Sequence, residues 1–179
     1  MRTLMLIVLT SLVACGGQST PEPAPAPEPA PAPAPAPEPE PEPEPEVNIV
    51  TITDNVAAVA LEGTDAMKFN ASTITVKAGN TVKLTLTHTG KMAKEVMGHN
   101  FVLLAKGADV DAFVKDAIAA KDTDHIPASM KDKIIAHTKL VGGGEADTIE
   151  FEAPEAGEYV FLCSFPGHFA LMKGTFVVE

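Results

Sequence analysis

The sequence contains little cysteine, little positive charge and no long apolar run at its N-terminal end. Its only two cysteines are Cys15 and Cys163. The N-terminal apolar run, residues 4–14, is much shorter than the about 20 residues that a membrane-spanning helix needs. There are 13 lysine and arginine residues against 24 aspartate and glutamate residues, which gives a net charge of −11. The run therefore cannot span a bilayer, and without a basic patch we expect no nucleic-acid partner.

Residues 1–14 have the pattern of a bacterial export signal. Arg2 supplies a positive start, and the apolar run follows it directly. The run ends at Ala14 and Cys15, in a pattern that resembles the lipobox of bacterial lipoproteins. We expect residues 1–14 to be a lipoprotein signal peptide and Cys15 to carry acyl chains that hold the protein on a membrane. Gly16 after the cysteine favours the outer membrane in such lipoproteins; an ordinary signal peptide with an incidental cysteine is the alternative.

Residues 15–46 form a segment of distinct composition. Every second residue from 21 to 45 is proline, which accounts for 13 of the 16 prolines. Such a segment lacks half of its amide hydrogens and has no apolar face to bury. We expect a disordered, extended tether of about 3.1 Å per residue. The folded domain is then residues 47–179, in which removal of Arg2 and the seven tether glutamates leaves 17 acidic and 12 basic residues.

Residues 47–179 have the pattern of an all-β domain. The clearest predicted strand is residues 81–88, in which apolar and polar side chains alternate strictly. Further strand candidates are residues 48–53, 56–61, 72–76, 99–104, 133–138, 147–152, 158–163 and 174–178. Short strands at such intervals predict an antiparallel β-sandwich. Residues 109–121 instead have apolar side chains at helical spacing, with Asp109 or Asp111 as N-cap, so we expect one helical insertion.

Three potential metal ligands lie within ten residues of one another near the end of this domain. Cys163 provides a thiol, His168 an imidazole and Met172 a thioether, all on the predicted loop between the last two strands. A thiolate and two imidazoles with a weak axial thioether are the ligands of blue-copper sites. The second histidine has to come from elsewhere in the fold, and His99, at the start of a predicted strand, is the natural candidate.

Other uses of these residues are less well supported. Cys163 alone would fit a buried, small apolar residue. A catalytic Cys–His pair also needs an orienting Asn or Asp and an open cleft, and nothing near the loop supplies them. A binuclear copper centre needs two bridging cysteines, and only Cys163 is available.

The same residues resemble those of azurins, the bacterial blue-copper proteins of the cupredoxin family. The resemblance rests on Cys163-x4-His168-x3-Met172, Gly98-His99-Asn100, Phe165-Pro166-Gly167-His168 and the sequence of residues 135–140. It runs from about residue 67 to residue 178 and implies a Greek-key β-sandwich of the cupredoxin type. The lipobox and the proline-rich tether resemble those of lipid-modified azurins of bacterial outer membranes.

The resemblance implies one type 1 copper ion per chain. Its implied ligands are three strong ones, a long axial one and an approaching main-chain carbonyl: His99, Cys163, His168, Met172 and Gly98. The main-chain amides of Asn100 and Phe165 would donate to the Cys163 sulfur and so tune the reduction potential.

In this family the ring of the second histidine reaches the surface within an apolar patch. Here the electron-exit patch would consist of His168 with Met92, Met97, Ile118, Phe165, Pro166, Gly167 and Ala170. Met92 and Met97 could instead belong to the core. Weak electron-transfer encounters bury little surface, so brief docking of another redox protein would suffice.

We therefore expect an electron-transfer protein and not an enzyme. Its expected partners are a c-type cytochrome and a periplasmic or surface-bound reductase or peroxidase, each bound weakly and transiently. The lipid anchor at Cys15 would keep the domain at the outer membrane, facing the periplasm or the cell surface. The alternative is a surface lipoprotein that protects against copper or oxidants or that contacts a host.

The chain departs from the usual azurin pattern at two points. No cysteine lies between residues 47 and 161, so the disulfide near the N-terminus of azurins is missing; such a bridge contributes about 2–5 kcal/mol in a small domain. Phe101 stands where azurins often have a buried tryptophan. Of the remaining histidines, we expect His125 and His137 at the surface and His88 partly buried.

Overall fold

The described part of the chain is one β-rich domain. The computed structural model describes residues 48–179. The expected signal peptide, the lipidation site Cys15 and the proline-rich tether lie outside the described residues. Within residues 48–179, no helix is both long enough and apolar enough to cross a membrane.

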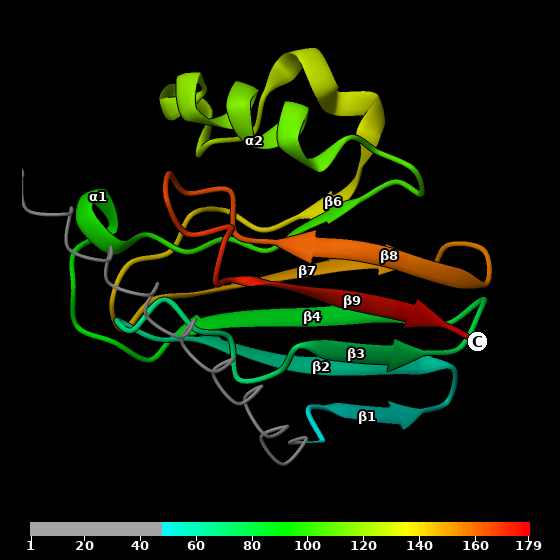
Figure 1. Cartoon of the computed structure of the whole chain (residues 1–179). Helices are drawn as coiled ribbons and strands as arrows, with labels where there is room; N and C mark the ends of the chain where they lie inside the picture. The colour runs from blue at the N-terminus through cyan, green and yellow to red at the C-terminus, as the bar shows by residue number, and fades with distance from the viewer. Residues whose placement is uncertain (1–47) are drawn as a thin grey trace, which may run out of the picture. The chain divides into compact units, whose positions relative to one another are not determined.

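Nine strands in residues 48–179 form two sheets that pack face to face (Figure 1). The first sheet has the order β1-β2-β4-β7, with β1 Val50–Thr53, β2 Val56–Gly63, β4 Thr81–His88 and β7 Ala146–Glu152. The second has the order β3-β9-β8-β5-β6, with β3 Thr73–Val76, β9 Lys173–Val178, β8 Gly157–Leu162, β5 Val102–Leu104 and β6 Ile134–His137. The predicted β-sandwich is confirmed.

The prediction of an antiparallel sandwich is wrong for two of the strand pairs. Strands β2 and β4 pair in parallel, and so do β3 and β9. The chain leaves β2 for β3 in the other sheet before it returns to β4, so β2 and β4 run in the same direction. The alternation of apolar residues reveals which face of a strand is buried, but not the direction of its neighbour.

The buried residues of β2 and β4 continue to the last residue of each strand, at one end of the sandwich. Buried and exposed residues alternate along the whole of β2, and every second residue of β4 is buried. This alternation places Leu84 and Leu86 in the core and continues to His88, which is fully buried at the end of β4. Gly63, the last residue of β2, is also buried and pairs with His88. The parallel pairing therefore brings a glycine and a histidine together at this end.

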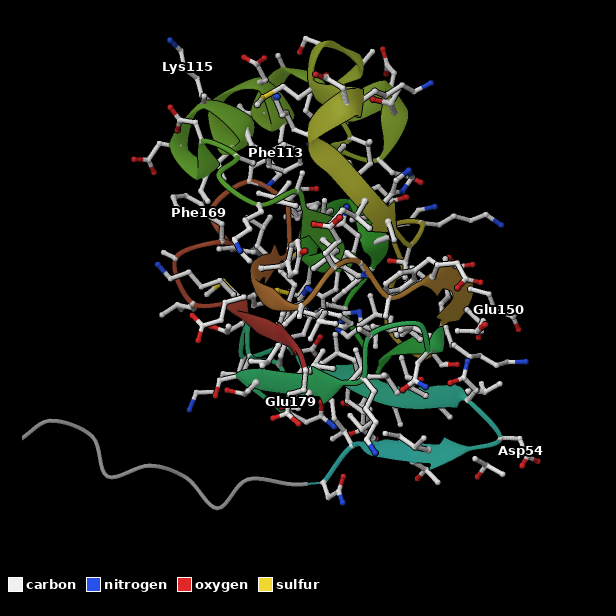
Figure 2. All side chains as sticks on the ribbon, turned by 90° about the vertical axis from the view of Figure 1, so that its right-hand side faces the viewer. Asp54, Phe113, Lys115, Glu150, Phe169 and Glu179 are labelled. Carbon is white, nitrogen blue, oxygen red and sulfur yellow. The ribbon has the colours of Figure 1, made fainter. Side chains whose placement is uncertain are left out.

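Helix α2, Val110–Ala119, covers the outer face of the second sheet at strands β5 and β8 (Figure 1). Its N-cap is Asp109, whose carboxylate accepts a hydrogen bond from the Ala112 amide at 3.0 Å, and not Asp111. The helix packs through a small apolar cluster, formed by Val102, Leu104, Phe113, Val114, Ala117, Ile126 and Leu162. Figure 2 shows Phe113 directed toward the domain and Lys115 directed away from it. The predicted helical insertion is confirmed.

Residues 48–179 also contain three short helices that the sequence did not predict: α1 Lys94–Met97, η1 Lys121–Thr123 and η2 Ala128–Lys133. Helix α1 lies directly before His99, at the same end of the sandwich as the loop between β8 and β9 (Figure 1). His99 does not open strand β5 as predicted. It forms an isolated bridge with Val141, with N–H to O distances of 2.9 and 2.8 Å.

Candidate metal centre

Three buried side chains converge at this end of the sandwich. One potential ligand atom from each of His99, Cys163 and His168 lies within 4.8 Å of the other two. The Sγ atom of Cys163 is 3.7 Å from Nδ1 of His168 and 3.9 Å from the carbonyl oxygen of Gly98. No more than 3% of the surface of any of the three residues is exposed. The structure thus brings together the residues that the sequence predicted as strong ligands.

The loop between β8 and β9 is closed by its own main-chain hydrogen bonds. The Cys163 amide donates to the Met172 carbonyl at 2.9 Å, and the Met172 amide donates to the His168 carbonyl at 2.8 Å. A turn from Phe165 to His168 is closed by a third bond of 3.0 Å, and Gly167 in this turn has a φ of 85° that favours glycine. These bonds fix His168 relative to Cys163, and Met172 is fully buried.

The ring of His99 has a defined tautomer. Its Nε2 atom lies 2.9 Å from the carbonyl oxygen of Thr64, and because a carbonyl only accepts, Nε2 carries the proton. Nδ1 is then an acceptor, and it is buried without a hydrogen-bond partner among the described residues. A buried polar atom left unpaired costs free energy. A metal ion would supply the missing partner, so the residues present fit a copper ion.

Burial keeps the Cys163 thiol protonated in the metal-free protein. It raises the pKa of Cys163 to about 11, although the main-chain N–H groups of Asn100 and Phe165 lower it. These are the two amides that the azurin resemblance implied as donors to the sulfur. A metal that binds here has to displace the thiol proton.

The two histidines are neutral at pH 7. Burial lowers the pKa of His168 to about 4, and the nearby His99 and His88 add to this effect. Burial also lowers the pKa of His99, against the opposing effect of its hydrogen bond to Thr64. Neutral imidazole is the form that binds metals.

Asn100 joins the two segments that carry the ligands. Its Oδ1 accepts from the Ser164 amide at 2.8 Å, and its Nδ2 donates to Ser164 Oγ at 2.8 Å and to the Asp124 carbonyl at 3.0 Å. The side chain is fully buried. Since Asn100 follows His99 and Ser164 follows Cys163, these bonds hold one ligand segment against the other.

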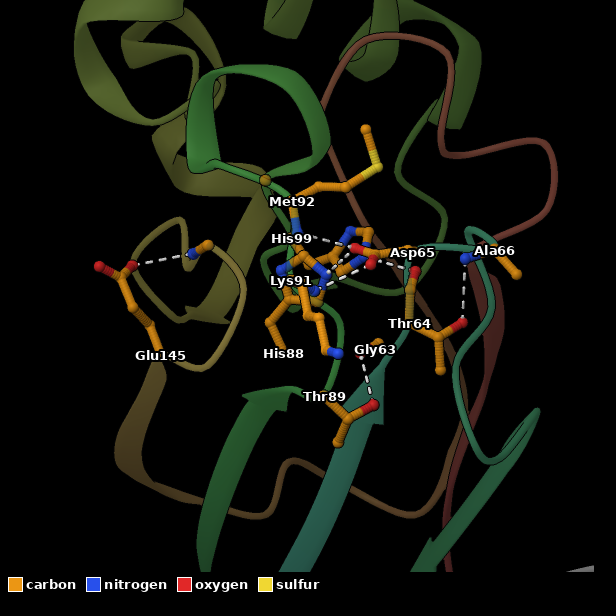
Figure 3. A network of polar contacts seen from close by, with 12 residues as sticks. Gly63, Thr64, Asp65, Ala66, His88, Thr89, Lys91, Met92, His99 and Glu145 are labelled. Carbon is orange, nitrogen blue, oxygen red and sulfur yellow. Dashed lines mark hydrogen bonds and ion pairs between the residues drawn. The ribbon is translucent and has the colours of Figure 1, made fainter.

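The other side of the His99 ring is formed by residues that the sequence did not single out. A Cβ added to Gly63 would come within 2.7 Å of His99 Cδ2, so the end of β2 lies directly against the ring. The next two residues, Thr64 and Asp65, contact His99 and His88 (Figure 3). These contacts join residues 23 and 35 positions apart, and no local sequence pattern predicts them.

Two of the three remaining histidines differ from expectation. His125 is 5% exposed instead of lying at the surface, because the turn after α2 lets its Nδ1 donate to the Ala117 carbonyl at 2.9 Å. Its ring packs edge-on against Phe165 at a centroid distance of 5.2 Å. His88 is fully buried instead of partly buried, because it continues the inward-facing set of β4. His137 is exposed, as predicted.

The residues of the predicted electron-exit patch differ in exposure. Met92 is 39% exposed and Ile118 57% exposed, while Gly167 and Ala170 are also exposed. Met97, Phe165 and Pro166 are half-buried. A pocket of about 340 Å³ has Ile118, Phe165 and Pro166 in its lining, so the exposed end of α2 lies near the loop. Met92 and Met97 are not core residues.

Comparison with known proteins shows which family the chain resembles. Residues 55–179 match the family of copper binding proteins described as the plastocyanin/azurin family. The chain belongs to this family.

Individual relatives include two bacterial azurins. Azurin-1 from Alcaligenes xylosoxydans xylosoxydans is 46% identical over 122 residues, which is 66% of this chain and 94% of the relative. Azurin from Pseudomonas aeruginosa is 42% identical over 127 residues, or 68% of this chain and 84% of the relative. Among solved structures, dithionite-reduced auracyanin from the photosynthetic bacterium Roseiflexus castenholzii is 35% identical, with a TM-score of 0.61 over 68% of this chain and 96% of that one.

Membership of the plastocyanin/azurin family confirms the predicted cupredoxin fold and the predicted activity. The chain is an azurin-like blue-copper electron carrier and not an enzyme. The cluster of His99, Cys163 and His168 fits one type 1 copper ion per chain.

Proposed function

We propose that this protein carries single electrons on a copper ion held by His99, Cys163 and His168, with Met172 and the Gly98 carbonyl as weaker contacts. The convergence of three buried ligand atoms within 4.8 Å is the observation that supports this assignment. The copper ion, when bound, supplies a one-electron change between its +1 and +2 states. Met172 lies beside the same cluster, since a Cβ on Gly63 would be 2.7 Å from the His99 ring and 3.4 Å from Met172 Cε.

The protein's contribution is to hold these side chains in place before the metal arrives. His99 is oriented by the Thr64 carbonyl, and the Cys163 segment is tied to the His99 segment through Asn100. The loop that carries His168 is closed by main-chain bonds. Ligands fixed in this way move little between oxidation states, and a small rearrangement favours fast electron transfer.

We infer that electrons enter and leave through His168. The residue is 3% exposed, and Gly167 and Ala170 of the same loop are exposed. The ring of Phe165 packs against the His168 ring at a centroid distance of 4.7 Å and an angle of 43°, and Ile118 adds exposed apolar surface nearby. Such a surface suits brief docking of another redox protein.

The proposed partners are a c-type cytochrome and a periplasmic or surface-bound reductase or peroxidase. The N-terminal sequence supports a location at the outer membrane, with Cys15 as the lipid anchor and residues 15–46 as a tether. The tether would let the domain face the periplasm or the cell surface and reach partners near the membrane.

Replacing Ile118 with aspartate should slow electron transfer to a c-type cytochrome. A charge placed in an apolar docking surface has to lose its water on association, and a cost of about 1.4–2.8 kcal/mol corresponds to a decrease of about 10- to 100-fold in the second-order rate. The rate is measured by stopped-flow mixing of the reduced copper protein with the oxidised cytochrome.

The matched control is Ile52→Asp, since Ile52 is 45% exposed and lies on the edge strand β1. It should leave the rate within about two-fold, and neither variant should change the visible spectrum. Equal rates for Ile118→Asp and the unmodified protein would show that the docking surface lies elsewhere.

A further inference from the structure

The turn after β2 meets the loop after β4 beside the candidate metal centre (Figure 3). The turn supplies the Thr64 carbonyl, which accepts the His99 Nε2–H bond at 2.9 Å and also a bond from the Met67 amide at 3.0 Å. The position of this one oxygen atom therefore sets the direction of the His99 ring. What holds the turn in place also holds His99.

Asp65 is the residue that ties the turn to the neighbouring loop. Its Oδ2 accepts from the Lys91 amide at 2.8 Å, and its Oδ1 accepts from the Met92 amide at 3.2 Å. The same Oδ1 lies 3.1 Å from Nε2 of the fully buried His88. Because a carboxylate only accepts, His88 donates through Nε2. These N–H groups, with that of Lys91 as the largest effect, lower the pKa of Asp65 and keep it ionised.

The loop leaves room for this carboxylate. A Cβ added to Gly90 would collide with the carboxylate atoms of Asp65. A glycine here lets the main chain of residues 89–92 wrap around the acid, so both amides can reach it. Both partners therefore fit the contact: the Asp65 carboxylate accepts the two amides, and Gly90 leaves space for it.

Other hydrogen bonds restrain the turn at its two ends. The far end is tied to β2 by Asn70, whose main-chain amide donates to the Glu62 carbonyl at 3.0 Å and whose Oδ1 accepts from the Glu62 amide at 2.9 Å. The Thr89 amide and hydroxyl donate to the Gly63 carbonyl at 2.9 and 3.2 Å, one residue before Thr64. The bonds of Thr64 with Met67 and Lys68 lie within the turn itself and do not fix it against the sheet. Thr64 therefore lies between the tie at Gly63 and the tie at Asp65, and the far end of the turn is held by Asn70.

Asp65 also influences the orientation of His99 through the ring of His88. The His88 ring lies 4.2 Å from the His99 ring between centroids, at an interplanar angle of 51°. The bond from His88 to Asp65 fixes the rotation of the His88 ring, and that ring packs against His99.

We propose that Asp65 is a positioning residue for the metal ligand His99, acting through the Thr64 carbonyl and the His88 ring. Asp65 does not touch the metal. It holds the turn and the buried histidine that together direct Nδ1 of His99 toward Cys163. The inference rests on the proposed ligand role of His99, and the test below separates the two.

The test uses Asp65→Ala in the metal-free and in the copper-loaded protein. In the metal-free protein, the His99 Nε2–H should exchange with solvent about ten-fold faster or more, because its acceptor is no longer held in place. This exchange is measured by NMR on the 15N-labelled full-length protein. In the copper-loaded protein, the electron paramagnetic resonance and visible spectra should change, and the affinity for copper should fall by about ten-fold.

Asp109→Ala is the matched control, since it also removes a carboxylate that accepts a main-chain N–H, at the N-cap of α2. It should lower the melting temperature without changing the exchange of the His99 ring proton or the copper spectra. If Asp65→Ala does not fold, Asp65→Asn serves instead, because the amide has one accepting oxygen for three donors. It should give a smaller change of the same kind.

An unchanged exchange rate of the His99 ring proton in the folded Asp65 variant, with the Lys91 and Met92 amides exchanging faster, would overturn the inference. Asp65 would then hold only the loop. A wrong ligand assignment would give a different result, because His99→Ala would then keep the copper spectrum of the unmodified protein. The exchange of the His99 ring proton in the metal-free Asp65 variant would still test the role of Asp65.

Discussion

Replacing Asn100 with alanine should destabilise the metal-free protein by about 3–5 kcal/mol. The buried side chain satisfies the amide and the hydroxyl of Ser164 and the carbonyl of Asp124. Its removal leaves these groups without their partner, and each unsatisfied buried group costs about 1–3 kcal/mol. Urea unfolding, followed by circular dichroism, measures the change in the free energy of unfolding.

The same substitution should also disturb the metal centre, because Asn100 joins the His99 segment to the Cys163 segment. We expect a broadened copper spectrum and a shifted reduction potential. Asn48→Ala is the matched control: Asn48 also accepts from a main-chain amide, that of Val50 at 3.2 Å, but at an exposed position. Its cost should stay near 1 kcal/mol or below. Similar losses for the two variants would contradict the special role of Asn100.

Metal binding near neutral pH should release one proton per metal ion. The pKa of Cys163 is raised to about 11 by burial, so the free thiol is protonated, whereas the bound sulfur is a thiolate. The pKa of His168 is lowered to about 4 and that of His99 is also lowered, so neither histidine contributes a proton above about pH 7. Binding therefore strengthens as the pH rises, by about ten-fold per pH unit.

Between about pH 7 and pH 10 this effect amounts to about 1,000-fold in affinity. It is measured by competition with a chelator for Cu(I), and the released proton is measured with an indicator dye in weakly buffered solution. No dependence on pH would mean that the thiol is already ionised in the metal-free protein. Release of two protons per metal ion would mean that a histidine is also protonated in the metal-free protein.

Local patterns in the sequence predicted much of the sheet structure. The alternation in residues 81–88 gives β4 with its correct ends, and the helical spacing after Asp109 gives α2. The proposed ligands Cys163, His168 and Met172 were predictable as candidates because they lie on one loop, where their spacing is visible in the sequence. His99 was predictable as the residue that completes this ligand set.

The surroundings of His99 were not predictable in this way. Thr64 and Asp65 reach the site because β2 and β4 pair in parallel and end together at Gly63 and His88. That pairing depends on how the chain crosses between the sheets, which no short period in the sequence encodes. The buried position of His125 likewise depends on a carbonyl of α2 that the fold brings to it.

Copper(II) titration, followed by visible absorption, tests most directly whether one sulfur and two imidazoles hold a single metal ion. If His99, Cys163 and His168 converge on one copper ion, an intense band will grow linearly and stop at one equivalent per chain. The band should be absent from Cys163→Ser, because it arises from the bond between sulfur and copper. If Cys163→Ser and the unmodified protein develop the same band, Cys163 is not a ligand and the proposed centre does not exist.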